Sequence, residues 1–210
     1  MSSPVVVREY AAPPIDRGEI LRYMGVRGDA PEVETLLETS LEELTHALSY
    51  RICAVELPVI AGNDTVLLGD VSLCSRELCD RLRGCVRAVV FAATVGSAPD
   101  RLIARYQRLS PTKALLVQAI GTERVEALCD VFERETRERE NKQGHEVRRR
   151  YSPGYGDLPL ETQRDIFRLL GNTARIGLAL GESLLMSPSK SVTAVLGIVE
   201  TNEKRNGNAE

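Results

Sequence analysis

The sequence predicts a single α+β domain with a mainly antiparallel sheet and flanking helices. Two β-rich runs, 52–60 and 65–68, flank the turn-forming tetrad 61–64, a pattern typical of a β-hairpin. The run 86–95 is almost entirely apolar, as expected of a strand that is covered on both faces. Strands thus occur singly and in a hairpin, with helical segments between the groups. This order favours an α+β fold over a doubly wound one.

The first part of the chain predicts three helices. Residues 1–15 are rich in proline and are expected to form an extended N-terminal segment. Asp16 can cap a helix that runs to Met24. Pro31 opens an amphipathic helix to about Tyr50, because its apolar residues recur at helical spacing. A shorter helix is expected over 75–83.

The middle of the chain predicts two more helices with conventional starts. Ser97, with Asp100 three residues later, forms a capping pattern. Ser110 followed by proline opens a helix that runs to about Glu140. The charged second half of that helix is expected to be a solvated face with favourable i,i+4 ion pairs. The expected pairs are Glu133 with Arg137 and Glu135 with Arg139.

The last part of the chain predicts one helix and two strands. The helix opens at Pro159 and runs to about Leu170, and the strands are expected over 175–186 and 191–199. The polar residues 201–210 are expected to form a flexible tail. Residues 16–200 are therefore expected to form the folded domain.

The composition is that of an ordinary globular protein: 210 residues, 43% hydrophobic and 27% charged. The net charge of −3 argues against a general nucleic-acid-binding protein. No apolar run approaches the ~18–20 residues that cross a bilayer, and the N-terminus lacks the pattern of a signal peptide. We therefore expect a cytoplasmic protein that binds neither nucleic acid nor membranes.

The sequence contains no pattern of catalytic or metal-binding residues. Its odd number of cysteines favours reduced thiols over disulfides, and their spacing matches no zinc or iron–sulfur motif. The cysteines are Cys53, Cys74, Cys79, Cys85 and Cys129. His46 and His145 are expected at the surface, without a nucleophile beside them in the sequence. We expect neither a catalytic residue nor a metal ligand.

The stretch from Arg150 to Pro159 predicts a rigid loop that can hold a ligand. The loop contains two prolines and two glycines, so it cannot be helical. Arg150 can form a bidentate pair with a carboxylate. The backbone at Gly154 can approach a ligand closely, and Tyr155 offers a ring face to an adenine or a sulfonium. S-adenosylmethionine carries a carboxylate, an adenine and a sulfonium, and so would fit such a loop. A rigid turn whose arginine caps backbone carbonyls is the alternative.

Two motifs in the right order resemble the activation domain of vitamin B12-dependent methionine synthase. Arg150-x-x-x-Gly154-Tyr155, followed by Pro159, resembles the S-adenosylmethionine-binding signature of that domain. The segment from Glu182 through Met186 to Pro188 resembles its Thr-Glu-Ser-x-x-Met-x-Pro hairpin. The likeness covers about residues 15–200 and is greatest to the free-standing form of the domain. It implies a twisted, mainly antiparallel sheet.

The resemblance also implies a function. Such a domain presents S-adenosylmethionine to cobalamin carried by a partner, while a flavodoxin- or ferredoxin-type reductant supplies an electron. The chain would then be the methyltransferase component that reactivates cob(II)alamin on a separate methionine synthase chain. The implied ligand contacts are Arg150, Ser152, Gly154, Tyr155 and Glu182, with Arg150 on the methionine carboxylate. Glu182 could bind the ammonium or sulfonium; an ion pair with Lys190 or Arg175 is the alternative.

The chain departs from the family pattern at three positions, which bears on its affinity for S-adenosylmethionine, and two other functions stay open. Asp157 and Leu158 stand where the long enzymes have Ala-Cys, and Gly181 replaces the threonine of the second motif. The chain could instead cap the cobalamin-bearing domain without turnover. It could also activate a different corrinoid methyltransferase.

Overall fold

The computed structural model describes residues 4–26 and 31–201. Their main feature is a seven-stranded, antiparallel sheet in the order β4-β3-β2-β5-β9-β6, with β1 paired to β2. Its strands are β1 Val6–Tyr10, β2 Tyr50–Ala61, β3 Thr65–Leu68, β4 Val71–Cys74, β5 Arg87–Thr94, β6 His145–Val147 and β9 Ser191–Glu200. A separate two-stranded sheet pairs β7, Ala179–Leu180, with β8, Met186–Ser187. The predicted α+β class and the mainly antiparallel sheet are confirmed.

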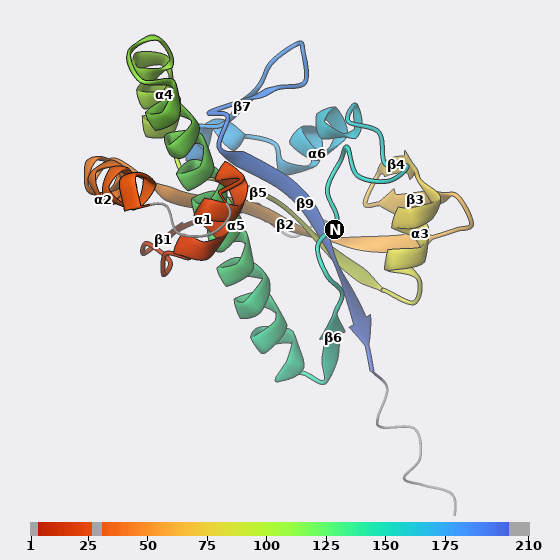
Figure 1. Ribbon diagram of the computed structural model, residues 1–210. Coiled ribbons are helices and arrows are strands. Elements are labelled where there is room, and N and C mark those ends of the chain that lie inside the picture. The colour runs from red at the N-terminus through yellow and green to blue at the C-terminus, as the bar shows by residue number, and fades with distance from the viewer. Residues whose placement is uncertain (1–3, 27–30, 202–210) are drawn as a thin grey trace, which may run out of the picture.

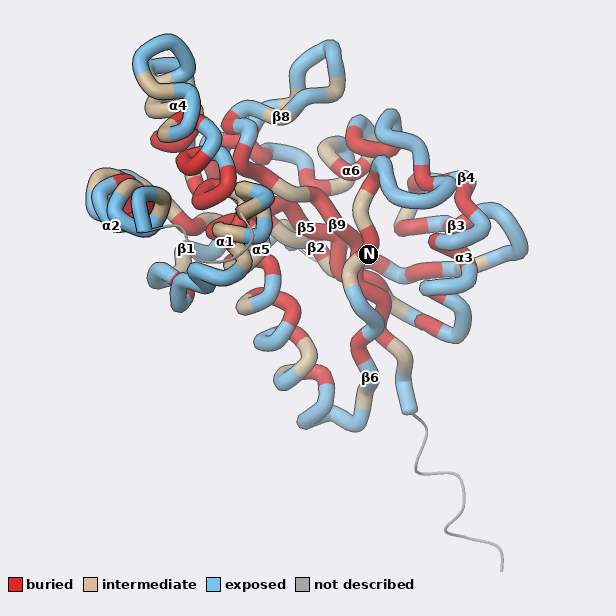
Figure 2. The backbone as a smooth tube through the Cα atoms, viewed as in Figure 1, coloured by how far each residue is buried: buried red, intermediate tan, exposed pale blue. Residues whose placement is uncertain are grey.

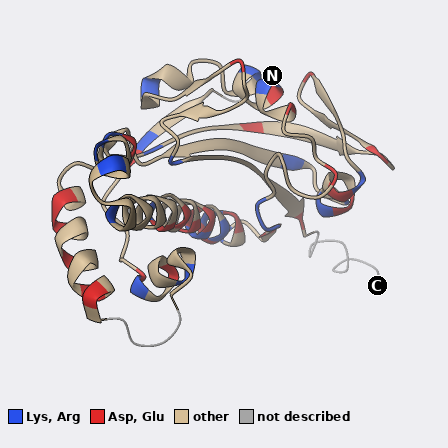
Figure 3. Cartoon of the chain, turned by 45° about the horizontal axis from the view of Figure 1, so that its top comes forward, with Lys and Arg blue, Asp and Glu red and all other residues tan. Residues whose placement is uncertain are grey.

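Helices cover both faces of the large sheet (Figure 1). They are α1 Arg17–Met24, α2 Pro31–Thr45, α3 Arg76–Leu82, α4 Ala98–Leu109, α5 Pro111–Asn141 and α6 Thr162–Leu170, with a short 3-10 helix at Thr173–Ile176. The long helix α5 lies along one face, as Figure 3 shows. Helices α3 and α6 pack against the other face. No helix within the described residues is long and apolar enough to span a membrane.

The core has a separate apolar layer on each face of the sheet, and the central strands are the most buried part of the chain (Figure 2). On the α5 face, Phe132 packs against Phe91 with 4.8 Å between ring centroids. On the opposite face, Leu78 of α3 and Ile166 of α6 pack against the other side of the same strands. A third cluster joins α1, α2 and α4 to the first half of α5. The sheet is thus held rigidly between two layers, as its alternating side chains require.

Most predicted elements are confirmed, including the hairpin of β2 and β3 and the helix from Pro111. Asp16 caps α1 by accepting from the backbone N–H of Glu19, and Gly25 ends the helix in a left-handed conformation. The continuous strand predicted over 175–186 is wrong, because only Ala179–Leu180 of β7 and Met186 of β8 lie in strands there. Residues 173–176 instead form a 3-10 turn that Gly177 ends at φ 72°.

Within the segment expected to be extended, β1 pairs with β2 along five residues. Two other predictions are corrected by the structure. Helix α2 ends at Thr45, five residues earlier than predicted. Ser97 makes no capping bond; its hydroxyl instead accepts from Arg101. Residues 202–210 of the predicted tail lie outside the described residues.

The charged second half of α5 is not simply a solvated face. Glu133 pairs with Arg137 as predicted, at 2.8 Å, but both Glu133 and Glu140 are buried. Arg139 pairs with Glu140 instead of Glu135. Figure 3 shows the acidic and basic positions side by side along this half of the helix. The buried acids mark the side of α5 that faces the sheet and the loop after β6.

Candidate functional site

The loop from Arg150 to Pro159 starts at an edge of the large sheet. Tyr151 forms an isolated antiparallel bridge with Val195 of β9, through hydrogen bonds of 3.0 and 2.9 Å. The loop then turns back on itself, where the N–H of Gly154 donates to the carbonyl of Leu158 at 2.8 Å. Gly154 has φ 88°, a conformation that favours glycine. The loop therefore has its own internal hydrogen bonds and a fixed start.

Asp157 fixes the far end of the loop to the first turn of α3. Its carboxylate accepts from the backbone N–H of Arg76 at 2.8 Å and of Glu77 at 3.3 Å, and from the hydroxyl of Ser75. Helix N-termini carry unpaired N–H groups, and an acidic side chain can satisfy them. These hydrogen bonds, that of Ser75 first, hold the pKa of Asp157 below its usual range. The departure from the family pattern at this position thus has a structural role.

Tyr151 and Glu77 fix the middle of the loop. The hydroxyl of Tyr151 donates to Glu77 at 2.7 Å and lies 2.8 Å from the carbonyl oxygen of Tyr155. The guanidinium of Arg81 stacks on the Tyr151 ring at 4.3 Å. Burial and the bond to Glu77 raise the pKa of Tyr151 to about 12, so its hydroxyl keeps its proton. Gly156 lies so close to Glu77 and Tyr151 that a Cβ there would overlap both side chains.

Arg150 lies among three carboxylates of α5. Its guanidinium donates to Glu126 at 2.9 Å, to Asp130 at 2.6 Å and to Glu133 at 2.9 Å. Burial alone would lower the pKa of Arg150, but its neighbours on α5, among them Asp130 and Glu126, raise it above its ordinary value. The alternative in which Arg150 caps backbone carbonyls does not match these contacts. Arg137 binds the other oxygen of Glu133 at 2.8 Å, so the cluster holds two positive charges against three negative charges.

A pocket of about 410 Å³ lies beside this cluster and brings three of the five predicted residues together. Arg150, Ser152 and Tyr155 line it, and Tyr155 is 66% exposed. The other lining residues are Arg81, Glu126, Tyr151, Pro153, Gln163, Met186, Ser191, Val192 and Thr193. The volume falls in the usual range for small-molecule sites. The first motif, the start of β9 and helix α5 therefore each contribute residues to the pocket wall.

The structure does not bring Gly154 or Glu182 into the pocket lining. Gly154 shapes the loop next to it. Glu182 lies in the exposed turn between β7 and β8, where its carbonyl oxygen is 3.4 Å from Arg164. Within the described part of the chain, Glu182 forms an ion pair with neither Lys190 nor Arg175, the alternative considered from the sequence. Met186 is the residue of the second motif that reaches the pocket.

Sequence reasoning missed Glu126, which contributes the only acidic side chain to the pocket lining within the described residues. It lies 24 residues before Arg150, in a helix whose second half is dense in charged residues. Glu126 and Arg150 also line a second hollow, of about 710 Å³, bounded by the segment before α1. That segment is held by Arg124, which is buried and donates to the carbonyls of Pro13 and Pro14.

No group of His, Cys, Asp and Glu side chains in the described residues is arranged to hold a metal ion. The five cysteines are free thiols, of which Cys74 is exposed and the other four are buried. His145 is half-buried rather than at the surface, and its ring nitrogen lies 3.0 Å from both Glu140 and Arg87. These residues lie outside the pocket beside Arg150.

Comparison with known proteins identifies the family. Residues 86–204 match the family described as vitamin B12 dependent methionine synthase, activation domain. The chain belongs to this family. Both motif segments fall inside the matched range, as does all of the pocket lining except Arg81.

A solved structure supports the fold over nearly the whole chain. It is the crystal structure of the MetH reactivation domain bound to AdoHcy (S-adenosylhomocysteine). The TM-score is 0.70 at 18% identity, and the match covers 96% of this chain and 80% of the other. No curated protein matches this chain. At this level of identity the structural likeness establishes the activation-domain fold and extends it to the residues before the family match.

Proposed function

We propose that this domain binds S-adenosylmethionine in the 410 Å³ pocket and presents its methyl group to cobalamin carried by a separate methionine synthase chain. One observation carries the proposal. Arg150, Ser152 and Tyr155, chosen from the sequence as ligand contacts, line one pocket. Family membership and the S-adenosylhomocysteine of the related structure support the choice of ligand.

The charge of the site fits this ligand. S-adenosylmethionine carries an ammonium, a sulfonium and a carboxylate, and hence one net positive charge. Arg150 and Arg137 face Glu126, Asp130 and Glu133, so this cluster carries one net negative charge. At the reduced dielectric of a pocket wall, such complementarity favours the sulfonium ligand over its neutral thioether product. The site is therefore suited to hold the methyl donor and to release the product.

Each lining residue has a role that its position permits. Arg150 has five N–H donors, and its bonds to the three acids leave donors for the carboxylate of the ligand. Glu126, at the pocket wall, would accept from the ligand's ammonium. The exposed ring of Tyr155 would lie against the adenine or the sulfonium. Gly154 does not line the pocket; it shapes the turn of the loop that holds Ser152 and Tyr155 in the wall.

The reaction demands positioning rather than acid–base catalysis. When the partner's cobalamin has been reduced by one electron from a flavodoxin- or ferredoxin-type donor, it accepts the methyl group, and S-adenosylhomocysteine remains in the pocket. The domain must hold the S–CH₃ bond toward the pocket mouth and exclude water, and such orientation lowers a barrier by several kcal/mol. The hydrogen bonds that fix the loop to α3 and β9 provide that rigidity. On this proposal the chain is the methyltransferase component of a methionine synthase reactivation system.

Isothermal titration with S-adenosylmethionine tests the binding step. Arg150→Lys keeps a positive charge among the three acids but loses the planar fork, so we expect affinity to fall about tenfold or more while the fold persists. Glu126→Gln should weaken S-adenosylmethionine binding more than S-adenosylhomocysteine binding. Arg108→Gln, at an exposed position on α4, is the matched control and should change neither.

The proposal is wrong if the folded protein shows no saturable heat with S-adenosylmethionine, both alone and with a cobalamin-bearing methionine synthase chain present. Visible spectroscopy of the mixture with a low-potential reductant tests the transfer step. We expect methylcobalamin to appear only when this domain and S-adenosylmethionine are both present. Binding without methylation would leave a capping role, and methylation only of another corrinoid protein would identify a different partner.

A further inference from the structure

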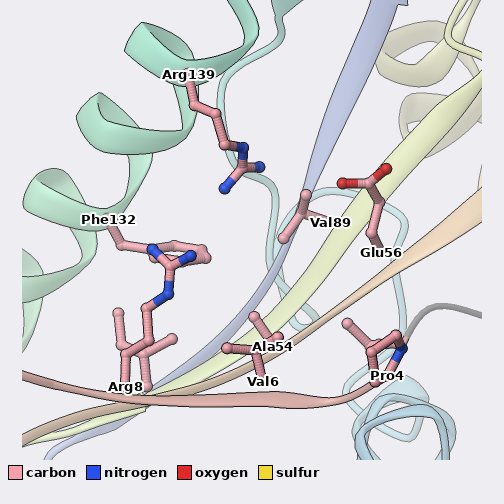
Figure 4. A pocket seen from close by; sticks show the side chains of 10 residues that line it. Pro4, Val6, Arg8, Ala54, Glu56, Val89, Phe132 and Arg139 are labelled. Atoms are coloured by element: carbon pink, nitrogen blue, oxygen red, sulfur yellow. The ribbon is translucent and has the colours of Figure 1, made fainter.

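A second, smaller cavity lies at the opposite edge of the sheet, between β1, β2 and the second half of α5 (Figure 4). Its volume is about 170 Å³. It shares no lining residue with the pocket beside Arg150, which lies against β9. The cavity extends from β1 across β2 to Val89 of β5, and β9, which lines the pocket beside Arg150, is the next strand. The two sites are therefore distinct, and a ligand of this cavity is not required by the proposed function.

The floor and walls of the cavity are apolar. Val6, Ala54 and Val89 come from three adjacent strands, and Phe132 faces them from α5 (Figure 4). Val89 and Phe132 are buried, whereas Val6 is 44% exposed at the mouth. The volume is close to that of a cavity known to hold one benzene molecule, roughly 150 Å³. The cavity thus accommodates a side chain of about four to six carbon atoms.

Charged groups of both signs extend over this apolar floor. The guanidinium groups of Arg8 and Arg139 lie toward one side, and the carboxylate of Glu56 points in from the other (Figure 4). Arg139 uses its Nε to bind Glu140, and Arg8 approaches Glu135 only at 3.8 Å. Glu56 accepts from Arg87 through Oε1. Within the described residues, no hydrogen bond occupies Glu56 Oε2 or the terminal nitrogens of Arg139.

We propose that this cavity binds a zwitterionic α-amino acid with a small apolar side chain. Arg8 and Arg139 would receive the carboxylate, Glu56 the ammonium, and the Phe132 cavity the side chain. A simple carboxylic acid would leave Glu56 Oε2 without a hydrogen-bond donor, and a simple amine would leave the terminal nitrogens of Arg139 without an acceptor. Only a ligand with both charges next to an apolar group satisfies the whole lining.

Titration of the isotope-labelled full chain with L-leucine, followed by amide chemical shifts, tests the proposal. We expect saturable shifts around Val6, Ala54 and Val89. Two matched probes lack one charge each: 4-methylpentanoate lacks the ammonium, and 3-methylbutylamine lacks the carboxylate. Both should bind at least about tenfold more weakly than L-leucine, as should glycine, which lacks the side chain. Equal binding of 4-methylpentanoate would overturn the role of Glu56.

Two variants keep the test specific. Ala54→Leu fills the cavity from β2 and should abolish the saturable shifts. Arg139→Gln removes one carboxylate partner and should weaken L-leucine binding by about tenfold, with Arg108→Gln as the control that changes nothing. If Ala54→Leu does not fold, the effect of Arg139→Gln on L-leucine binding still tests the proposal. If the unaltered protein shows no saturable shifts with L-leucine up to tens of millimolar, the dissociation constant would be too weak for a specific site, and the proposal would be excluded.

Discussion

The two segments that the sequence singles out are held by the fold in different ways. The loop from Arg150 to Pro159 is fixed along its length: to β9 through Tyr151, to α3 through Asp157, and to α5 through Arg150. The turn between β7 and β8 is exposed, and Leu185, at its end before β8, is 69% exposed. Two motifs of similar length can therefore contribute to the pocket in different ways. The first builds the pocket wall, and the second contributes mainly through its ends.

The two residues that follow the second segment, Ser189 and Lys190, are anchored by hydrogen bonds. Asp100 accepts from the backbone N–H of Ser189 at 2.8 Å and also from its hydroxyl. Lys190 is buried, and it donates to the hydroxyl of Thr122 at 3.1 Å. Burial lowers the pKa of Lys190. These contacts fix the start of β9, which lines the pocket, and leave the turn from Gly181 to Leu185 as the free part.

The largest effect is expected from Gly156→Ala, which tests whether the first segment must stay fixed. The new Cβ would overlap Glu77 and Tyr151, and the residue has φ 52°. Overpacking and the left-handed conformation together should lower the free energy of unfolding by about 3 kcal/mol. Urea denaturation measures that loss. Titration should show S-adenosylmethionine affinity falling more than about tenfold, because the loop must move.

Gly144→Ala is the matched control for Gly156→Ala. Gly144 also has a positive φ, of 77°, but a Cβ there would meet no atom within 4 Å. This variant should therefore lose only the conformational preference of glycine, about 1 kcal/mol, and should keep its affinity for S-adenosylmethionine. Equal losses of affinity in both variants would mean that the crowding at Gly156 does not position the site.

A smaller effect is expected from Asp157→Asn, which weakens one anchor of the first segment without crowding it. The amide can still accept one hydrogen bond, but it lacks the charge that the N-terminal turn of α3 favours. The pKa of Asp157 is lowered in the folded protein. Its charge therefore stabilises the fold fully above the unfolded pKa, about 3.9, and the effect is lost as the pH falls through the lowered folded value. The difference in melting temperature between variant and unaltered protein should be constant near pH 7 and disappear in acid. A difference that grows in acid would contradict this assignment.

Most of the fold was predictable because its helices and strands can be recognised from local sequence patterns. The apolar run 86–95 and the proline-started helix from 111 need no tertiary information. The short strands β4 and β6 were missed, because four and three residues give too little pattern and owe their conformation to pairing with β3 and β9. The false strand over 175–186 follows from apolar residues that are buried without being in a strand, as Ile176 and Leu178 are.

The candidate site could be predicted only where backbone-restricting residues marked it. Prolines and glycines around Tyr155 predicted a rigid loop, and in the structure hydrogen bonds of Tyr151 and Asp157 fix that loop to β9 and α3. Glu126 was missed because, along the sequence, it is one charged helix position among many. Only the packing of α5 against the loop distinguishes it, by placing Arg150 within 2.9 Å. Glu182 shows the reverse: a residue inside a recognisable motif whose side chain lies away from the pocket.

The smallest effect is expected from Glu182→Gln, which tests the second segment directly. The residue is exposed and its side chain makes no described hydrogen bond or ion pair, so the free energy of unfolding should stay within about 0.5 kcal/mol of the unaltered value. S-adenosylmethionine affinity of the isolated domain, measured by titration, should also be unchanged. The decisive control is Glu126→Gln, the same chemical change at the pocket wall, which should weaken binding. If Glu182→Gln weakens binding as much as Glu126→Gln does, the turn must close over the ligand, and the second segment belongs to the site after all.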